Sequence, residues 1–210
     1  MVMYSKKLLI MVLALMPVSL WAQDNTWERS EEEQVEEQQK KQKVDSKYLR
    51  GAVPLVDGKV VFSKHIDAPG KSSAAIYDIV HGYMEKMTHE SNQLQGTKLV
   101  TEDPQSGIVA GGFEEWLVFK KNAFSLDRTR MLYAFKAECR NGGVDLTITH
   151  IRYVYDEARD VQRYVAEEWI TDKEAVNKKN TRLLPLCGKF RRKTIDRKDF
   201  LFNKIESLLK

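Results

Sequence analysis

The sequence predicts an α+β fold, a curved antiparallel sheet with two long helices packed on one face. Three observations predict it: helical spacing of apolar residues early and late in the chain, strand-like segments between them, and turn residues where those segments meet. Helices gathered on one face of an antiparallel sheet are a stable solution for such an order of elements. The expected order is β-α-β(4-5)-α.

The N-terminus has the features of a secretory signal peptide at residues 1–22. Lys6 and Lys7 precede a short apolar run, Leu8–Leu20, and Ala22 offers a small residue for cleavage. The run is shorter than the about 20 apolar residues of a membrane-spanning helix, and a retained anchor is the minority alternative. We therefore expect a periplasmic or secreted protein with no transmembrane span in the mature chain.

The segment that follows, residues 23–46, is polar, acidic and rich in glutamine. From Glu28 to Gln42 it reads ERSEEEQVEEQQKKQ, a composition that cannot bury enough apolar surface to offset its ordering entropy. We expect a disordered tether there. Residues 47–210 then form a single domain, long enough to bury a core without disulfides.

The first elements of this domain are a strand and an amphipathic helix. Lys59–His65 follow the turn signal Asp57-Gly58 and have the composition of a strand. Ser72 or Ser73 then begins a helix whose apolar residues recur at three- and four-residue spacing. These apolar residues are Ile76, Ile79, Val80, Tyr83, Met84 and Met87.

A first hairpin is predicted next. Lys98–Glu102 and Gly107–Ala110 flank the turn Asp103-Pro104-Gln105-Ser106. Gly111-Gly112 indicates a bulge or bend before the strand Phe113–Phe119, because glycine inside a strand pattern usually marks one.

A second hairpin pairs Arg128–Cys139 with Val144–Tyr155 across Asn141-Gly142, which tolerates the positive φ angles of a tight turn. In the first strand, alternate residues from Met131 onward are apolar and share one face. In the second, the alternation breaks at His150. Either that strand bulges or its distal half is covered on both faces.

The last elements are helical. Thr171-Asp172-Lys173-Glu174 has the spacing of a capping box and predicts a short helix. Leu184–Gly188 is interpreted as a loop. Lys193–Leu209 is the second long helix, because its apolar residues again follow helical spacing.

Cys139 and Cys187 are the two cysteines. An oxidising compartment permits a disulfide between them, and two reduced thiols are the alternative, because sequence alone does not supply the Cα separation. Their spacing excludes a CxxC redox centre.

Five stretches after the tether carry a resemblance to a known family, and together they span nearly the whole of that region. The stretches are Tyr48–Pro54, Gly58–Phe62, Ser125–Arg130, Ala166–Ala175 and Gly188–Asp196. They resemble a family of exported Bacteroidetes domains, the domain of unknown function 4468 family, described as having a TBP-like fold. The resemblance implies a curved antiparallel sheet backed by two helices, and it implies no activity. The TBP label describes shape and gives no reason to expect DNA binding.

No nucleophile-elbow, zinc-protease, phosphate-loop or dinucleotide motif is present, so we expect no catalytic residue and no cofactor. His81, Glu85 and His89 have a spacing that suits a metal such as zinc, but a polar helix flank is the preferred interpretation and no metal site is predicted. Glu114-Glu115 and Glu167-Glu168 are adjacent residues on expected strands. Each pair therefore points to opposite faces and forms no acid–base dyad by itself.

The candidate binding residues are Glu168, Trp169, Arg191 and Arg192. They lie in the stretches that carry the resemblance, and Trp169 could place its ring beside arginine planes. One interpretation is a recognition patch for an anionic or sugar-like ligand. The other, which we prefer, is a structural clasp in which Arg191 or Arg192 pairs with Glu167 or Glu168.

The late part of the chain is rich in basic residues, which form either a patch for an anionic partner or a solvated helix face. The partner in the first case is a phospholipid or lipopolysaccharide head group, or the protein's own acidic arm. The basic residues are Lys173, Lys178, Lys179, Arg182, Lys189, Arg191, Arg192, Lys193, Arg197 and Lys198.

We therefore expect a non-enzymatic binding domain for an envelope protein or an anionic amphiphile. Its natural recognition surface is the concave side of the sheet, if helices leave it uncovered. The alternative is a hydrolase of envelope glycans or peptides with an unrecognised site. A shallow surface with basic and aromatic residues favours the first, and a pocket with perturbed carboxylates favours the second. Export argues against nucleic acid as a partner.

Overall fold

The computed structural model describes residues 45–122, 125–155 and 160–210. The predicted signal peptide, and the predicted tether as far as residue 44, lie outside the described residues. Within the described ranges, no helix is long and apolar enough to cross a membrane.

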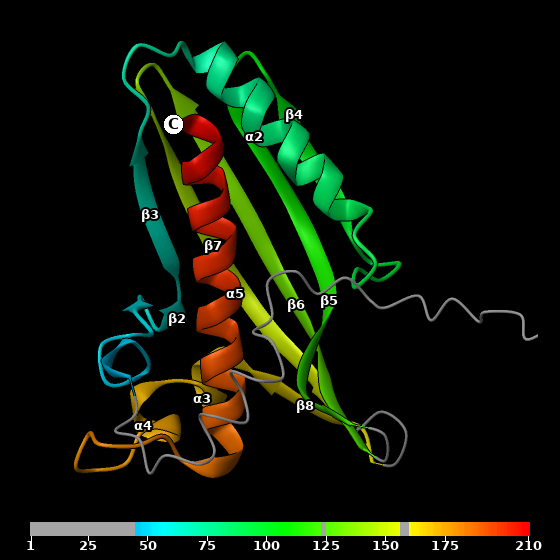
Figure 1. The fold of residues 1–210 in the computed structure, drawn as a ribbon, viewed down its shortest axis with the longest axis vertical. Coiled ribbons are helices and arrows are strands. Elements are labelled where there is room, and N and C mark those ends of the chain that lie inside the picture. The colour runs from blue at the N-terminus through cyan, green and yellow to red at the C-terminus, as the bar shows by residue number, and fades with distance from the viewer. Residues whose placement is uncertain (1–44, 123–124, 156–159) are drawn as a thin grey trace, which may run out of the picture.

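The domain is an antiparallel sheet with two long helices on one face, as predicted (Figure 1). The strands lie in the order β3-β7-β6-β5-β4, and β8 pairs with the distal part of β7, along the same edge as β3. The two long helices are α2 (Ser73–Thr88) and α5 (Pro185–Leu209). The sheet strands are β3 (Phe62–Asp67), β4 (Lys98–Asp103), β5 (Ile108–Asn122), β6 (Ser125–Arg140), β7 (Gly143–Tyr155) and β8 (Gln162–Val165). The short elements are η1 (Ser46–Tyr48), β1 (Leu55–Val56), β2 (Lys59–Val60), α3 (Ala166–Trp169) and α4 (Asp172–Ala175).

The predicted strand Lys59–His65 is divided in two. Asp57 and Gly58 both have positive φ, and they turn β1 back onto β2 as a small separate hairpin. The Val61 amide then donates to the Pro54 carbonyl oxygen at 3.2 Å. Only the residues from Phe62 onward pair with β7 in the main sheet.

Helix α2 agrees with its predicted pattern. Ser72 caps it, because the Ser72 hydroxyl oxygen accepts a hydrogen bond from the Ala75 amide at 3.2 Å. The predicted stripe faces the sheet and is buried except for Ile79, which is half-buried at its edge. The apolar stripe therefore supplies the core contact of this helix.

The bulge predicted at Gly111-Gly112 lies on the neighbouring strand instead. Strand β5 runs unbroken through both glycines, while the register of β4 shifts between Leu99 and Thr101. A Cβ at Gly111 would lie 2.9 Å from the Lys98 carbonyl oxygen and 2.9 Å from the Phe113 ring. Glycine is present because the bulged strand and a core aromatic ring both approach the backbone closely.

The second hairpin forms as predicted, and the break in its alternation is a bulge. Leu132 pairs with Arg152 and Ala134 with Thr149, so β7 contains one extra residue. His150 takes a φ of 56° at this point. The bulge returns Ile151 and Tyr153 to the buried face that Ile148 occupies before it.

Two predictions about the last segments need correction. Helix α4 forms behind Thr171, but the Thr171 side chain makes no capping hydrogen bond. Helix α5 begins at Pro185, so the predicted loop Leu184–Gly188 is largely its first turn. Proline suits the first turn because its missing N–H is not needed there. A Cβ at Gly188 would lie 2.6 Å from the Leu183 Cβ, so glycine allows this turn to pack closely.

The two adjacent glycines of β5, Gly111 and Gly112, provide a test of the close approach between β5 and the bulge of β4. Gly111→Ala should lower the free energy of unfolding by about 1–3 kcal/mol, because its methyl group overpacks the bulge and the Phe113 ring. Gly112→Ala is the matched control, since its Cβ would meet nothing within 4 Å. Urea denaturation measures both, and equal stability of the two variants would contradict the assigned close approach.

Candidate functional site

Arg191, one of the predicted binding residues, is fully buried and bound by four acceptors. Its guanidinium donates to the carbonyl oxygens of Tyr48 at 2.6 Å, Leu49 at 2.5 Å and Ile170 at 2.7 Å, and to Asp172 Oδ1 at 2.6 Å. Burial lowers the pKa of Arg191, and the hydrogen bond and charge of Asp172 oppose that effect. The residue joins η1, α3 and α4 to helix α5 and so acts as a structural clasp.

The clasp uses a different acid from those predicted. Asp172 holds Arg191 and also accepts a hydrogen bond from the Gly51 amide at 2.8 Å. Glu167 instead accepts the Val60 amide at 3.0 Å, and Glu168 is exposed. Both glutamates lie in the short helix α3 rather than on the strand expected for them.

Trp169 does not lie beside arginine planes. Its ring stacks on Tyr164, with centroids 3.7 Å apart and planes at 8°, and it meets the edge of Phe190 at 5.9 Å. The Arg192 guanidinium lies 5.4 Å from the centre of the Tyr48 ring. Of the four predicted binding residues, Arg191 therefore forms the clasp and Trp169 packs against other aromatic rings. Glu168 does not pair with Arg191.

The other sequence candidates are also separated. Cys139 and Cys187 are both free thiols. They lie at opposite ends of the molecule, because Cys139 is beside the start of α2 and Cys187 is in the first turn of α5 (Figure 1). Burial raises the pKa of Cys139 to about 11. In the described part of the chain, no group of three His, Cys, Asp or Glu residues is arranged to hold a metal.

His81 belongs to the possible metal-binding trio of α2, and its ring instead contacts a carboxylate on the sheet. His81 Nε2 lies 2.6 Å from Glu102 Oε2, and the His81 ring stacks on Tyr77 with centroids 5.5 Å apart. His89 is the C-cap residue of the helix, and both His89 and Glu85 are exposed. The arrangement is that of a polar helix flank.

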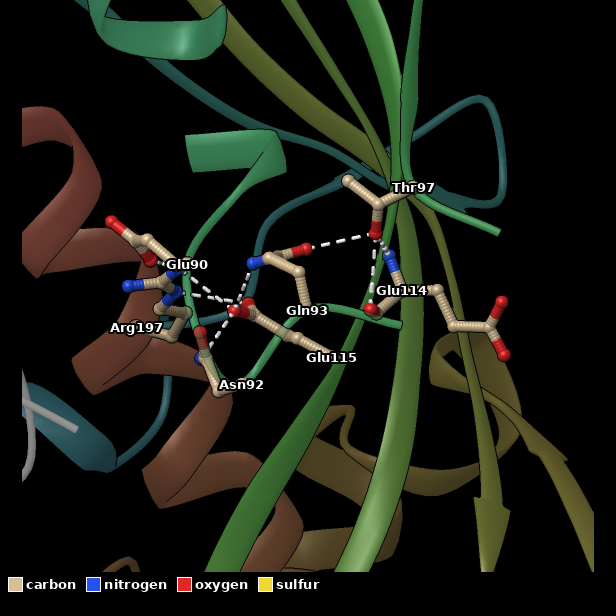
Figure 2. A network of polar contacts seen from close by, with 7 residues as sticks. All are labelled: Glu90, Asn92, Gln93, Thr97, Glu114, Glu115 and Arg197. Carbon is tan, nitrogen blue, oxygen red and sulfur yellow. Dashed lines mark hydrogen bonds and ion pairs between the residues drawn. The ribbon is translucent and has the colours of Figure 1, made fainter. Parts of the chain in front are cut away.

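A buried ion pair that the sequence did not reveal lies between the sheet and α5. Arg197 donates from Nε to Glu115 Oε1 at 2.9 Å and from Nη2 to Glu115 Oε2 at 2.7 Å. Both residues are at most 1% exposed. The side-chain amides of Asn92 and Gln93 each donate to Glu115 Oε2 at 2.9 Å, and Arg197 also reaches Glu90 at 3.2 Å (Figure 2).

Adjacent carboxylates on β5 point to opposite faces, as predicted. Figure 2 shows Glu115 pointing toward Arg197 and Glu114 pointing away from it. Glu114 pairs instead with Arg130 at 2.8 Å. Glu114 and Arg130 therefore lie on the face of the sheet that is turned away from α2 and α5. We call this face the open face.

The strand registers bring arginines together on the open face. Trp116 pairs with Arg130, Arg130 with Val154 and Val154 with Arg163 across four strands. In the neighbouring row, Leu132 pairs with Arg152. Because paired residues share a face, these side chains all project to the same side of the sheet.

Contacts within this open-face cluster (Trp116, Arg128, Arg130, Arg152 and Arg163) differ from one arginine to the next. The Arg128 guanidinium lies 3.6 Å from the centre of the Trp116 ring, a cation–π arrangement. Arg130 pairs with Glu114. Arg152 and Arg163 are exposed, and neither has an ion-pair partner among residues 45–122, 125–155 and 160–210. The cluster therefore presents two unneutralised charges on the same face of the sheet as the Trp116–Arg128 stack.

Sequence reasoning missed this cluster because it depends on register. The alternation of the second hairpin already separates Arg128 and Arg130 from the buried residues. Strand β8 was not predicted, however, so the sequence analysis could not place Arg163 on the sheet. The bulge at His150 also decides which face Arg152 occupies.

Comparison with known proteins identifies the family. Residues 62–154 match a family described as a domain of unknown function (DUF4468) with TBP-like fold. A crystal structure of a DUF4468 family protein from Bacteroides ovatus is 43% identical, has a TM-score of 0.74, and is matched over 80% of this chain and 96% of that chain. This chain belongs to the DUF4468 family. The resemblance predicted from sequence is thus confirmed.

A second solved structure shares the fold of this DUF4468 chain. It is a TBP-like protein from Parabacteroides distasonis, 16% identical, with a TM-score of 0.60, matched over 75% of this chain and 96% of that chain. A search of curated proteins gives no match. The region matched to the DUF4468 family runs from β3 to the end of β7, so it contains Trp116, Arg128, Arg130 and Arg152 and excludes helix α5.

The buried pair leads to a stability prediction for this DUF4468 domain. Arg197→Met should lower the free energy of unfolding by about 3–5 kcal/mol, because it leaves the buried Glu115 carboxylate without its cation. Glu115→Gln removes that stranded charge, so the double variant should be more stable than Arg197→Met alone. Urea denaturation of the single and double variants measures the coupling, and strictly additive losses would contradict a direct ion pair.

Proposed function

We propose that this DUF4468 protein is a non-enzymatic binding domain that recognises an acidic surface of another protein with the open face of its sheet. The observation that carries this proposal is the open-face cluster, in which Arg128 and Arg130 lie next to Trp116 and two exposed arginines, Arg152 and Arg163, lie further across the same face. Tryptophan and arginine are the residues most enriched at binding hot spots. The shallow basic and aromatic surface is the feature that favours binding over hydrolysis.

The cluster has the properties of a prepared protein-binding surface. Stacking of Arg128 on Trp116 and pairing of Arg130 with Glu114 fix these side chains before a partner arrives, which lowers the entropy lost on binding. Arg152 and Arg163 supply guanidinium groups that can hold a carboxylate with two parallel hydrogen bonds. Carboxylates of an acidic partner would form ion pairs with these two guanidinium groups.

The strand surface beside the cluster leaves room for side chains of a partner. Gly112 pairs with Ala134, and Ala134 pairs with Thr149 on the same open face. These three small residues make the adjoining row of the sheet low and flat. A partner can therefore place larger side chains there while its acidic groups reach the arginines.

The hydrolase alternative gains no support from a specific observation. Glu90 is the carboxylate that lines the hollow between α2 and α5, and it is held by Arg197 at 3.2 Å. Glu115 is buried and accepts two hydrogen bonds from the same arginine, so it is not accessible to a substrate. We keep binding as the proposed function.

Charge reversal on the open face tests the proposal. Arg152→Glu combined with Arg163→Glu should weaken capture of the native partner at least about tenfold, because two attractive contacts become repulsive. Lys178→Glu combined with Lys179→Glu is the matched control, since both lysines are exposed and the change in charge is equal. Crosslinking pull-down of the full chain from its native cells, with mass spectrometry, identifies the partner, and titration of that partner measures affinity.

The proposal fails if no specific partner is captured. It also fails if the same partner binds the wild-type chain, the open-face variant and the control variant equally. Circular dichroism of each variant confirms that the fold is retained, so a loss of binding reports on the surface.

The compartment is a further part of the proposal. Export by the signal peptide at residues 1–22 would deliver the domain to partners in the envelope, with residues 23–44 between the new N-terminus and the folded region. N-terminal sequencing of the protein from its native cells should then begin at Gln23. A sequence that begins at Met1 would contradict export by cleavage.

A further inference from the structure

Helices α2 and α5 diverge on the covered face (Figure 1). Residues of both helices line a groove. The groove has a volume of about 830 Å³, within the range of small-molecule sites. Residues from α2, from the turn after it and from α5 line the groove. They are Ile79, Gly82, Tyr83, Lys86, Glu90, Ser91, Phe200, Lys204 and Leu208.

The walls of this groove are apolar. Ile79 on α2 and Phe200 and Leu208 on α5 line the hollow. Leu208 is 39% exposed, although it is a large aliphatic residue on a helix with a well-formed buried face. Covering these side chains would remove apolar surface from water, so the groove favours an aliphatic ligand.

The rim of the groove carries one lysine on each helix. Lys86 on α2 and Lys204 on α5 have no ion-pair partner among the residues that the structure describes. Other lysines near α5 are neutralised, since Lys64 pairs with Glu206 at 2.5 Å and Lys189 with Asp127 at 2.8 Å. Two unpaired cations beside an apolar hollow complement one anionic head group.

The floor of the groove is fixed by the buried network of Figure 2. Glu90 lines the groove and pairs with Arg197, and the Arg197 guanidinium lies 5.4 Å from the centre of the Phe200 ring. Tyr83 also lines the groove, is 8% exposed, and has a hydroxyl group with no hydrogen-bond partner in the described structure. Glu90 and Glu115 share the single Arg197 guanidinium, which leaves one net negative charge at the floor, and the two lysines of the rim outnumber it.

We propose that this groove binds a single-chain anionic amphiphile. Its aliphatic chain lies against Ile79, Phe200 and Leu208, and its head group lies between Lys86 and Lys204. A carboxylate and a phosphate satisfy the two lysines equally well, so the shared chemistry is an anionic head on an aliphatic chain. This site is on the face opposite the open-face cluster and is independent of it.

Calorimetric titration with defined amphiphiles tests this site. The probes are dodecanoate, dodecyl phosphate, dodecyl maltoside and dodecyltrimethylammonium, each below its critical micelle concentration. We expect binding of dodecanoate, dodecyl phosphate or both. Binding of dodecanoate alone indicates a fatty acid source, and binding of dodecyl phosphate alone indicates a phospholipid source. Failure of both anionic probes overturns the proposal, and equal binding of the neutral or cationic probe overturns the role of the lysines.

Variants locate the binding in the groove. Lys86→Glu combined with Lys204→Glu should weaken binding of the anionic probe at least about tenfold. Gly82→Leu should abolish it, because a side chain at Gly82 would enter the groove and a Cβ there meets nothing within 4 Å. Leucine also favours the helix, so this variant should fold.

Two control variants complete the test. Lys178→Glu combined with Lys179→Glu makes the same charge change outside the groove and should leave amphiphile binding unchanged. Arg152→Glu combined with Arg163→Glu should also leave it unchanged, so failure of the open-face proposal and failure of this one are distinguishable. Binding that persists in both groove variants would place the ligand elsewhere and overturn the inference.

Discussion

Two buried guanidinium groups fix helix α5 against the rest of the domain. Removing such a charge from water costs several kcal/mol, so each must find partners inside the fold. Arg191 finds three carbonyl oxygens and Asp172, and it secures the first turns of α5 to η1, α3 and α4. Arg197, about 9 Å further along the helix, pairs with Glu115 of β5. These two contacts and the buried apolar face of α5 together set its position on the sheet, and the groove between α5 and α2 follows from that position.

The same strand connects the covered face with the open face. Glu115 points under α5 to Arg197, whereas its neighbour Glu114 points to the open face and pairs with Arg130 (Figure 2). Strand geometry requires this division, because successive side chains alternate across a sheet. A rigid covered face therefore supports the open face from behind. The open-face cluster gains its preorganisation from β5 and β6, which carry Trp116, Arg128 and Arg130 and are held by the core on their other side.

Periodicity and turn residues were sufficient to predict the main elements, and they failed where an irregularity was decided by tertiary contact. The stripe of α2 and the Asn141-Gly142 hairpin follow from local sequence. The bulge opposite Gly111 lies in β4, because the glycine serves a close approach by its neighbour and not a bend of its own strand. The start of α5 at Pro185 was missed because Pro-Leu-Cys-Gly resembles a loop until Leu183 is seen packed on Gly188. The preferred clasp interpretation named Arg191 but not its acid, Asp172. Burial of Arg197 was unpredictable, since a run of basic residues normally indicates an exposed surface.

Charge density along the sequence is therefore a poor guide to the ligand surfaces of this DUF4468 protein. The basic late segment contains two arginines that are buried and two lysines, Lys189 and Lys198, that pair with aspartates. Lys178 and Lys179 are exposed, but neither lines the groove nor belongs to the open-face cluster. Arg152 and Arg163 share a face of the sheet with the Trp116–Arg128 stack, and Lys86 and Lys204 line an apolar hollow. An exposed cation adds little affinity alone, because water screens it. Each proposed surface therefore combines exposed cations with an apolar or aromatic group, and only the fold places them on the same surface.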